Sequence, residues 1–182
     1  MTAPAVPSRW ALWLPLALFA GFVVLVMIGL LRPADRTIAS QMVGKPMPEF
    51  ALPARVPDRP GLARADLIGG KPRLLNVFAS WCVPCITEAR VLGQLRLAGV
   101  EIVGVAIRDR QDDVSGFLDR HGNPYTRIGA DDVSAVQFAL GSSGVPESFI
   151  VAADGTIRYQ HIGEIRDDQV PMILAKLKEA EQ

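Results

Sequence analysis

Trp81-Cys82-Val83-Pro84-Cys85 is the stretch that decides the fold, because it holds both cysteines of the chain where an apolar run gives way to a helical pattern. Residues 73–79 (RLLNVFA) are mostly apolar, which is typical of a buried central strand. Over 82–97, apolar side chains recur every three or four residues, which predicts a helix. The sequence therefore predicts a C-x-x-C motif at a strand-to-helix junction.

The position of this motif gives the two cysteines different roles. Free N–H groups of the first helical turn, together with the helix dipole, favour a thiolate on Cys82, and the thiolate is the nucleophile. Cys85 lies one turn deeper, within disulfide reach, so it would resolve the mixed disulfide that the more exposed Cys82 forms. Pro84 suits the first turn, where a missing N–H costs nothing. Because so small a ring stabilises a fold little, we expect a disulfide that opens and closes.

Other uses of a cysteine pair need residues that the chain lacks. A zinc site needs two more ligands, and the two histidines, His121 and His161, do not have the spacing of a zinc finger. A c-type haem site needs a histidine directly after the second cysteine, where Ile86 stands. We therefore expect no metal and no other cofactor.

Beyond the motif, strands and helices alternate. Strands are predicted over 100–107, 125–128, 148–152 and 156–161, and helices over 112–121, 131–140 and 168–181. Residues 45–70 contain five prolines and so allow only short edge strands. The pattern predicts an α/β fold in which helices flank a mixed central sheet.

A long uncharged segment precedes this domain. Residues 10–31 carry no charge, and 19 of these 22 residues are apolar. As a helix they would cross a bilayer, whereas the apolar region of a cleaved signal peptide is shorter, about 7–15 residues. We therefore predict an N-terminal segment at 1–9, a transmembrane anchor at 10–31, a linker at 32–44 and a redox domain at 45–182. Residues 33–182 hold 17 basic and 19 acidic side chains, so nucleic-acid binding is disfavoured.

Four blocks of sequence carry a family resemblance. They are 44–50 (GKPMPEF), 75–85 (LNVFASWCVPC), 122–125 (GNPY) and 144–149 (GVPESF). With the N-terminal segment, they resemble the thioredoxin superfamily and, more narrowly, the membrane-anchored DsbE/CcmG proteins of cytochrome c maturation. The resemblance implies a thioredoxin-like redox domain in the periplasm, held at the bacterial inner membrane, with residues 1–9 in the cytoplasm.

The same resemblance implies a function. It implies a thiol:disulfide oxidoreductase that reduces the haem-binding cysteines (C-x-x-C-H) of apocytochrome c, recharged by a membrane thiol-transfer protein of the DsbD or CcdA type. In an oxidising compartment those client cysteines would otherwise cross-link before haem attachment. Two alternatives stay open: an anchored reductase for other clients, such as copper-site cysteines, and a non-catalytic adaptor that binds apocytochrome. A peroxidase is disfavoured because its Pro-x-x-x-Thr-x-x-Cys site is missing.

The residues around the cysteines are candidates for substrate binding or tuning: Trp81, Pro84, Val145, Pro146, Glu147, Glu88 and Asn76. The resemblance implies a cis peptide at Val145-Pro146 beside the active site, where neighbouring backbone groups would pair with an extended client.

Three polar residues in this group have separate expectations. Glu147 is expected to tune the cysteines electrostatically. Asn76 stands where thioredoxins have a buried Asp, and we expect it to satisfy backbone groups. Glu88, three residues after Cys85, either lies on a solvated helix face or takes part in proton transfer.

Overall fold

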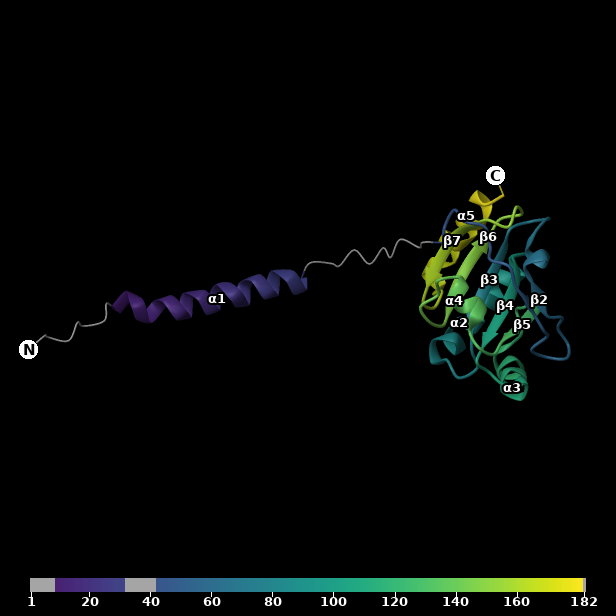
Figure 1. Ribbon diagram of the computed structural model, residues 1–182, viewed down its shortest axis with the longest axis horizontal. Coiled ribbons are helices and arrows are strands. Elements are labelled where there is room, and N and C mark those ends of the chain that lie inside the picture. Colours follow the sequence, from purple (N-terminus) through teal and green to yellow (C-terminus); the bar gives the residue numbers. More distant parts are fainter. Residues whose placement is uncertain (1–8, 32–41, 182) are drawn as a thin grey trace, which may run out of the picture. The chain divides into compact units, whose positions relative to one another are not determined.

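The computed structural model describes residues 9–31 and 42–181, and the chain divides into two units, Met1–Ala39 and Ser40–Gln182. The first unit contains helix α1 (Arg9–Leu31; Figure 1). Within the described residues, whose side chains in α1 run from 13 to 29, no helix is long and apolar enough to cross a membrane. The prediction over 10–31 is thus confirmed as a helix and not as a membrane span. The predicted segments 1–9 and 32–44 lie mostly outside the described residues.

A five-stranded mixed sheet forms the centre of the second unit. Its strands are β3 (Arg73–Phe78), β4 (Glu101–Ile107), β5 (Arg127–Asp131), β6 (Glu147–Val151) and β7 (Ile157–Ile162). They lie side by side in the order β5-β4-β3-β6-β7 (Figure 1). Strands β3, β4 and β5 are parallel, whereas β6 runs antiparallel to β3, and β7 antiparallel to β6. The predicted mixed sheet is therefore confirmed.

Three helices cover one face of this sheet. They are α2 (Val83–Leu97), α3 (Gln111–His121) and α5 (Val170–Glu179). Helix α2 joins β3 to β4, and α3 joins β4 to β5, so two right-handed crossovers in the same direction place both helices on the same face. Helix α5 packs against α2.

The opposite face carries smaller elements. They are β1 (Ala51–Leu52), β2 (Leu62–Ala63) and the 3-10 turn η1 (Arg64–Leu67). A Cβ atom at Gly129 of β5 would lie 2.8 Å from Leu52 Cβ, so this hairpin packs directly on the strand. The Ala130 N–H donates to the Pro53 carbonyl at 2.9 Å, so the 53–54 segment also covers the outer edge of β5.

Three predicted elements differ in extent from the observed ones. The strand predicted over 125–128 is β5 (Arg127–Asp131), which begins later because the Tyr125 N–H donates to the Asn123 side chain at 3.1 Å. The predicted helix over 131–140 shortens to α4 (Ala135–Ala139) because Asp131 ends β5 and receives the N–H groups of Ala135 and Gln137 at 2.8 and 2.9 Å. The closing helix begins as a 3-10 turn, η2 (Asp167–Gln169), before α5.

The strand register sorts the residues of the sheet onto its two faces. Directly opposed residues point to the same side, and successive residues of a strand alternate. Asn76 therefore shares a face with its partners Gly104 and Ser148, and this is the α2 face, since Asn76 bonds Glu88 of α2. Val77 and its partner Glu147 point to the opposite face.

Candidate active site

A disulfide joins Cys82 and Cys85, with their Cα atoms 5.3 Å apart. Cys82 is the N-cap residue of α2, and the Cys85 N–H donates to its Sγ at 3.2 Å. Pro84 lies in the first turn of the helix. The predicted placement of the motif at a strand-to-helix junction is therefore confirmed. An N–H group aimed at this sulfur stabilises a thiolate there once the disulfide opens.

The immediate neighbours of the cysteines are exposed, while the cysteines are not. Trp81 and Val83 are 55% and 71% exposed, whereas Cys82 and Cys85 are 4% and 2% exposed. The expectation of an exposed Cys82 is thus wrong, because the sulfur turns into the helix end and its neighbours form the surface. Trp81 and Val83 therefore form an exposed apolar shoulder beside the buried cysteines.

The loop before the cysteines is held by a carboxylate that the sequence analysis did not single out. Asp109 accepts hydrogen bonds from the Ser80 N–H at 2.5 Å and from the Ser80 hydroxyl at 2.8 Å. The indole of Trp81 donates to the Arg108 carbonyl at 3.3 Å. Both partners follow the end of β4, so the adjacent strand positions the loop. An aspartate two residues after the end of a predicted strand was the available sequence signal.

The Val145-Pro146 peptide is cis, as expected. The next residue, Glu147, opens β6 and pairs with Val77, near the carboxyl end of β3. Cys82 follows that same end of β3, so the register brings the cis peptide and the cysteines to one end of the sheet. An extended client at this end would meet both.

Asn76 makes three hydrogen bonds, all to side chains. Its Nδ2 donates to Glu88 Oε2 at 3.1 Å and to Ser148 Oγ at 3.0 Å. Its Oδ1 accepts from the Tyr125 hydroxyl at 2.8 Å. The expectation that Asn76 satisfies backbone groups is therefore wrong. Tyr125 and Ser148 were missed, although Tyr125 closes the GNPY block and Ser148 lies within GVPESF.

Glu88 lies on the buried face of α2, one turn after Cys85. It is 1% exposed, which excludes the solvated helix face. Its Oε1 accepts from the Ile165 N–H at 2.9 Å. Burial raises the pKa of Glu88 from 4.5 to about 7, and the hydrogen bonds from Ile165 and Asn76 oppose that rise. A carboxyl with this pKa exchanges protons near neutral pH.

Glu147 is buried as well, on the opposite face of the sheet. Its Oε2 accepts from the Ser143 N–H at 3.1 Å, and its Oε1 accepts from the Gln160 amide. These bonds tie the loop that carries Val145-Pro146 to β7. No hydrogen bond in the described part of the chain joins Glu147 to a cysteine, so its tuning role stays a prediction.

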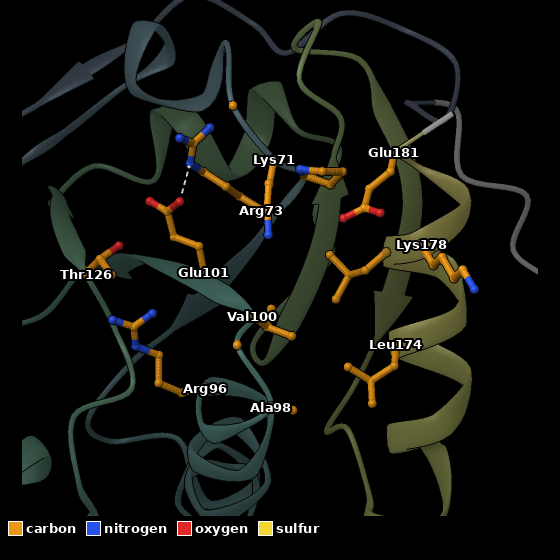
Figure 2. A pocket seen from close by; sticks show the side chains of 14 residues that line it. Lys71, Arg73, Arg96, Ala98, Val100, Glu101, Thr126, Leu174, Lys178 and Glu181 are labelled. Atoms are coloured by element: carbon orange, nitrogen blue, oxygen red, sulfur yellow. Dashed lines mark ion pairs between the residues drawn. The ribbon is translucent and has the colours of Figure 1, made fainter.

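A pocket of about 640 Å³ lies at the other end of the sheet. Arg73 and Glu101, which form an ion pair at 3.0 Å, line one side, and Leu174 and Lys178 of α5 line another (Figure 2). Arg73 begins β3, whereas Cys82 follows the end of that strand, roughly 17 Å further on. The pocket is therefore separate from the disulfide. Within residues 9–31 and 42–181, no group of three His, Cys, Asp or Glu side chains could hold a metal ion.

Known proteins share this arrangement. The chain is 40% identical over 159 residues to the thiol:disulfide interchange protein DsbE of Pseudomonas fluorescens biotype C, covering 87% of both chains. It is 36% identical over 159 residues to the thiol:disulfide interchange protein HelX of Rhodobacter capsulatus, covering 87% of this chain and 90% of that one.

A comparison with solved structures finds the same fold. A Chlorobium tepidum structure described as DsbE superimposes with a TM-score of 0.64 at 24% identity, covering 74% of this chain and 94% of that one, which shows the thioredoxin-like fold. The Redoxin family model matches residues 42–177. The chain therefore belongs to the Redoxin family, as a thiol:disulfide oxidoreductase with Cys82 and Cys85 as its redox pair.

Proposed function

We propose that the protein reduces the haem-binding cysteines of apocytochrome c in the bacterial periplasm. The observation that carries this proposal is the buried Cys82–Cys85 pair, set between an apolar shoulder and the cis peptide at one end of the sheet. An extended C-x-x-C-H segment could lie along that end. The blocks that resemble the DsbE/CcmG proteins of cytochrome c maturation support apocytochrome c as the client.

The reaction is a two-electron exchange. In the reduced protein, the Cys82 thiolate attacks one sulfur of the client disulfide, whose S–S bond breaks as a mixed disulfide forms. The Cys85 thiolate then attacks Cys82 Sγ, and the client leaves with two thiols. Cys82 and Cys85 are left as the disulfide seen here, having given two electrons and two protons to the client. A membrane thiol-transfer protein of the DsbD or CcdA type would reduce the pair again.

The residues around the cysteines have three further roles in this proposal: contact with the client, the geometry of the first turn of α2, and proton transfer. Trp81 provides apolar contact for the client, and Val145-Pro146 leaves backbone groups free to pair with it. Pro84 fixes the first turn of α2, which aims the Cys85 N–H at Cys82 Sγ. Glu88, one turn from Cys85, accepts the Cys85 proton as that thiol turns into the attacking thiolate.

Location is part of the same proposal. The absence of charge over residues 10–31 supports an inner-membrane anchor, and the similarity to DsbE proteins supports a redox domain on the periplasmic side. The test is fractionation of cells that express the full chain, followed by alkaline carbonate extraction. Release of the protein by carbonate would refute the anchor and leave the redox proposal standing.

The test of the function is a trap. In full-length protein with Cys85→Ser, Cys82 attacks a client but cannot be displaced, so mixed disulfides accumulate and mass spectrometry identifies them. The matched control is the Cys82→Ser/Cys85→Ser double variant, which should trap nothing.

Each outcome of the trap has a meaning. Apocytochrome c peptides with C-x-x-C-H support the proposal. If copper-site proteins are trapped instead, the protein is a reductase for copper-site cysteines, which is the alternative given above. If both variants trap nothing while the folded protein still binds apocytochrome, it is an adaptor and the reductase proposal is wrong.

A further inference from the structure

Under α2, four side chains form one hydrogen-bonded group that the exchange reaction does not by itself explain. The Tyr125 hydroxyl donates to Asn76 Oδ1, and Asn76 Nδ2 donates to both Glu88 and Ser148. Tyr125 is buried, and its ring stacks on Phe78 with a centroid separation of 4.7 Å. The phenol is therefore held in one place relative to the Asn76 amide.

The orientation of that amide matters for Glu88. An Asn side chain has an acceptor on one side and two N–H donors on the other. As placed, one donor faces Glu88 and stabilises an ionised carboxylate there, and the other faces the Ser148 hydroxyl. If the amide turned over, its oxygen would face the carboxylate and would favour the protonated form.

Tyr125 opposes that turn. Its hydroxyl is the hydrogen-bond donor to Asn76 Oδ1, at 2.8 Å. Burial, and to a lesser extent the charge of Glu88, raise the pKa of Tyr125 well above its usual value, so the phenol keeps the proton it donates.

We propose that Tyr125 is a positioning residue for thiol–disulfide exchange: its hydroxyl fixes the Asn76 amide with the N–H groups toward Glu88, and this sets how readily Glu88 takes up and returns a proton. This inference rests on the proton-transfer role proposed above for Glu88. Among the hydrogen bonds of the described residues, that of the Tyr125 hydroxyl goes to Asn76, and Asn76 in turn donates to Glu88.

Other ionisable groups lie on the elements around Glu88, and one of them, Glu164, acts on it without passing through Asn76. Glu164 raises its pKa through charge repulsion. His161 of β7 lies opposite Ser148 on the same face of the sheet, and its Nε2 lies 3.2 Å from the Glu164 carbonyl oxygen. On α2 itself, Cys85 lies one turn earlier, and Arg90 pairs with Asp167 on the exposed side. All of these stay in place when only the Tyr125 hydroxyl is removed.

The test is Tyr125→Phe in the full-length, oxidised protein, where the cysteines do not titrate. Carboxyl-labelled glutamate allows the Glu88 titration to be followed by NMR from pH 5 to pH 9. One weakened hydrogen bond to the charged form should raise the Glu88 pKa by about half to one unit. The pH profile of exchange with a C-x-x-C-H peptide should move upward with it.

The matched control is Tyr159→Phe, which removes the other tyrosine hydroxyl of the chain. Within the described residues, that hydroxyl makes no hydrogen bond to the Asn76 group, so the Glu88 titration should stay in place. A double-mutant cycle separates positioning from packing. Asn76→Ala alone should also raise the Glu88 pKa, and adding Tyr125→Phe should change it no further.

Two results would overturn the inference. One is a folded Tyr125→Phe protein with an unchanged Glu88 titration, and the other is a full Tyr125→Phe shift on the Asn76→Ala background. Neither depends on the client, because the titration is measured without one. Failure of the apocytochrome trap would instead count against the proposed function alone.

Discussion

The two faces of the central sheet each bury one glutamate to the same degree, and the two carboxyls serve different parts of the molecule. Glu88, on the helix that begins at the cysteines, and Glu147, next to the cis peptide, are each 1% exposed. Each accepts one backbone N–H and one side-chain amide. Burial and hydrogen-bond number therefore do not distinguish them.

What distinguishes the two glutamates is the element each is attached to. The partners of Glu88 belong to the group under α2, one turn from Cys85, which is why we propose a proton-transfer role for it. The partners of Glu147 belong to the loop before β6 and to β7, so its hydrogen bonds hold the backbone next to the cis peptide. A buried carboxyl at an active site can thus serve either in proton transfer or in holding the backbone, and the residues that it bonds indicate which of the two to expect.

The largest expected effect concerns the ionisation of Glu88. The folded-state pKa of about 7 lies above the unfolded value of 4.5, so folding retains a proton between these pH values. The contribution of Glu88 to stability is then greatest below pH 4.5 and is lost as pH rises through 7, by about 3 kcal/mol in total. In Glu88→Gln this fall should disappear, as urea denaturation at pH 4.5 and pH 8 would show. If the free energy of unfolding changed equally with pH in the two proteins, Glu88 would not be the group responsible for the fall. Its proposed role in proton transfer would then be wrong.

A smaller effect is expected from crowding the α2 face. A Cβ atom at Gly104 would lie 2.9 Å from Phe78 Cε1 and 3.1 Å from Tyr125 Cδ1. Gly104→Ala should therefore cost about 1–3 kcal/mol of stability and displace Tyr125 from Asn76, raising the Glu88 pKa. Gly129→Ala is the control, because its Cβ would meet Leu52 on the other face at 2.8 Å. Gly129→Ala should destabilise the fold and leave the pKa of Glu88 unchanged. If the pKa of Glu88 also shifted in Gly129→Ala, crowding on the α2 face would not be the cause of the shift in Gly104→Ala.

The smallest effect is expected at Glu147. In Glu147→Gln, one amide N–H group replaces an acceptor and faces the Ser143 N–H or the Gln160 amide, so one hydrogen bond is lost. The cost should be about 1 kcal/mol, as urea denaturation at pH 7 would show, with the rate of thiol–disulfide exchange unchanged. A slower exchange in a protein of nearly unchanged stability would show that Glu147 also has a chemical role, and the contrast with Glu88 would fail.

Much of the fold could be predicted because periodicity and turn residues report local structure. Strand β3, helix α2 and the β6–β7 hairpin were predicted to within one or two residues. The helix over 131–140 was overestimated because Asp131, counted as its first residue, instead ends a strand and receives the N–H groups of Ala135 and Gln137. An apolar pattern does not show which way a carboxylate points.

The site was predictable only where its residues are neighbours in sequence. The cysteine motif and Pro84 lie in one block, and their roles follow from helix geometry. The Asn76 group joins residues 49 and 72 positions apart, so no local pattern indicated Tyr125 or Ser148 as its partners. Glu88 stayed undecided for the same reason, since its burial depends on strands that pack against α2.

The exposed indole of Trp81 also has an optical consequence. Of the three tryptophans in the chain, Trp10 and Trp13 belong to the first unit, so Trp81 is the only one in 40–182. It directly precedes Cys82, one of the two disulfide-bonded cysteines, and a disulfide in contact with an indole quenches the fluorescence of the indole. With Trp10 and Trp13 replaced by Phe, the emission of Trp81 should brighten when the disulfide opens and dim when it closes. Trp81 fluorescence would then report the redox state of the Cys82–Cys85 pair. Stopped-flow fluorescence could measure the rate of each exchange reaction without an added label.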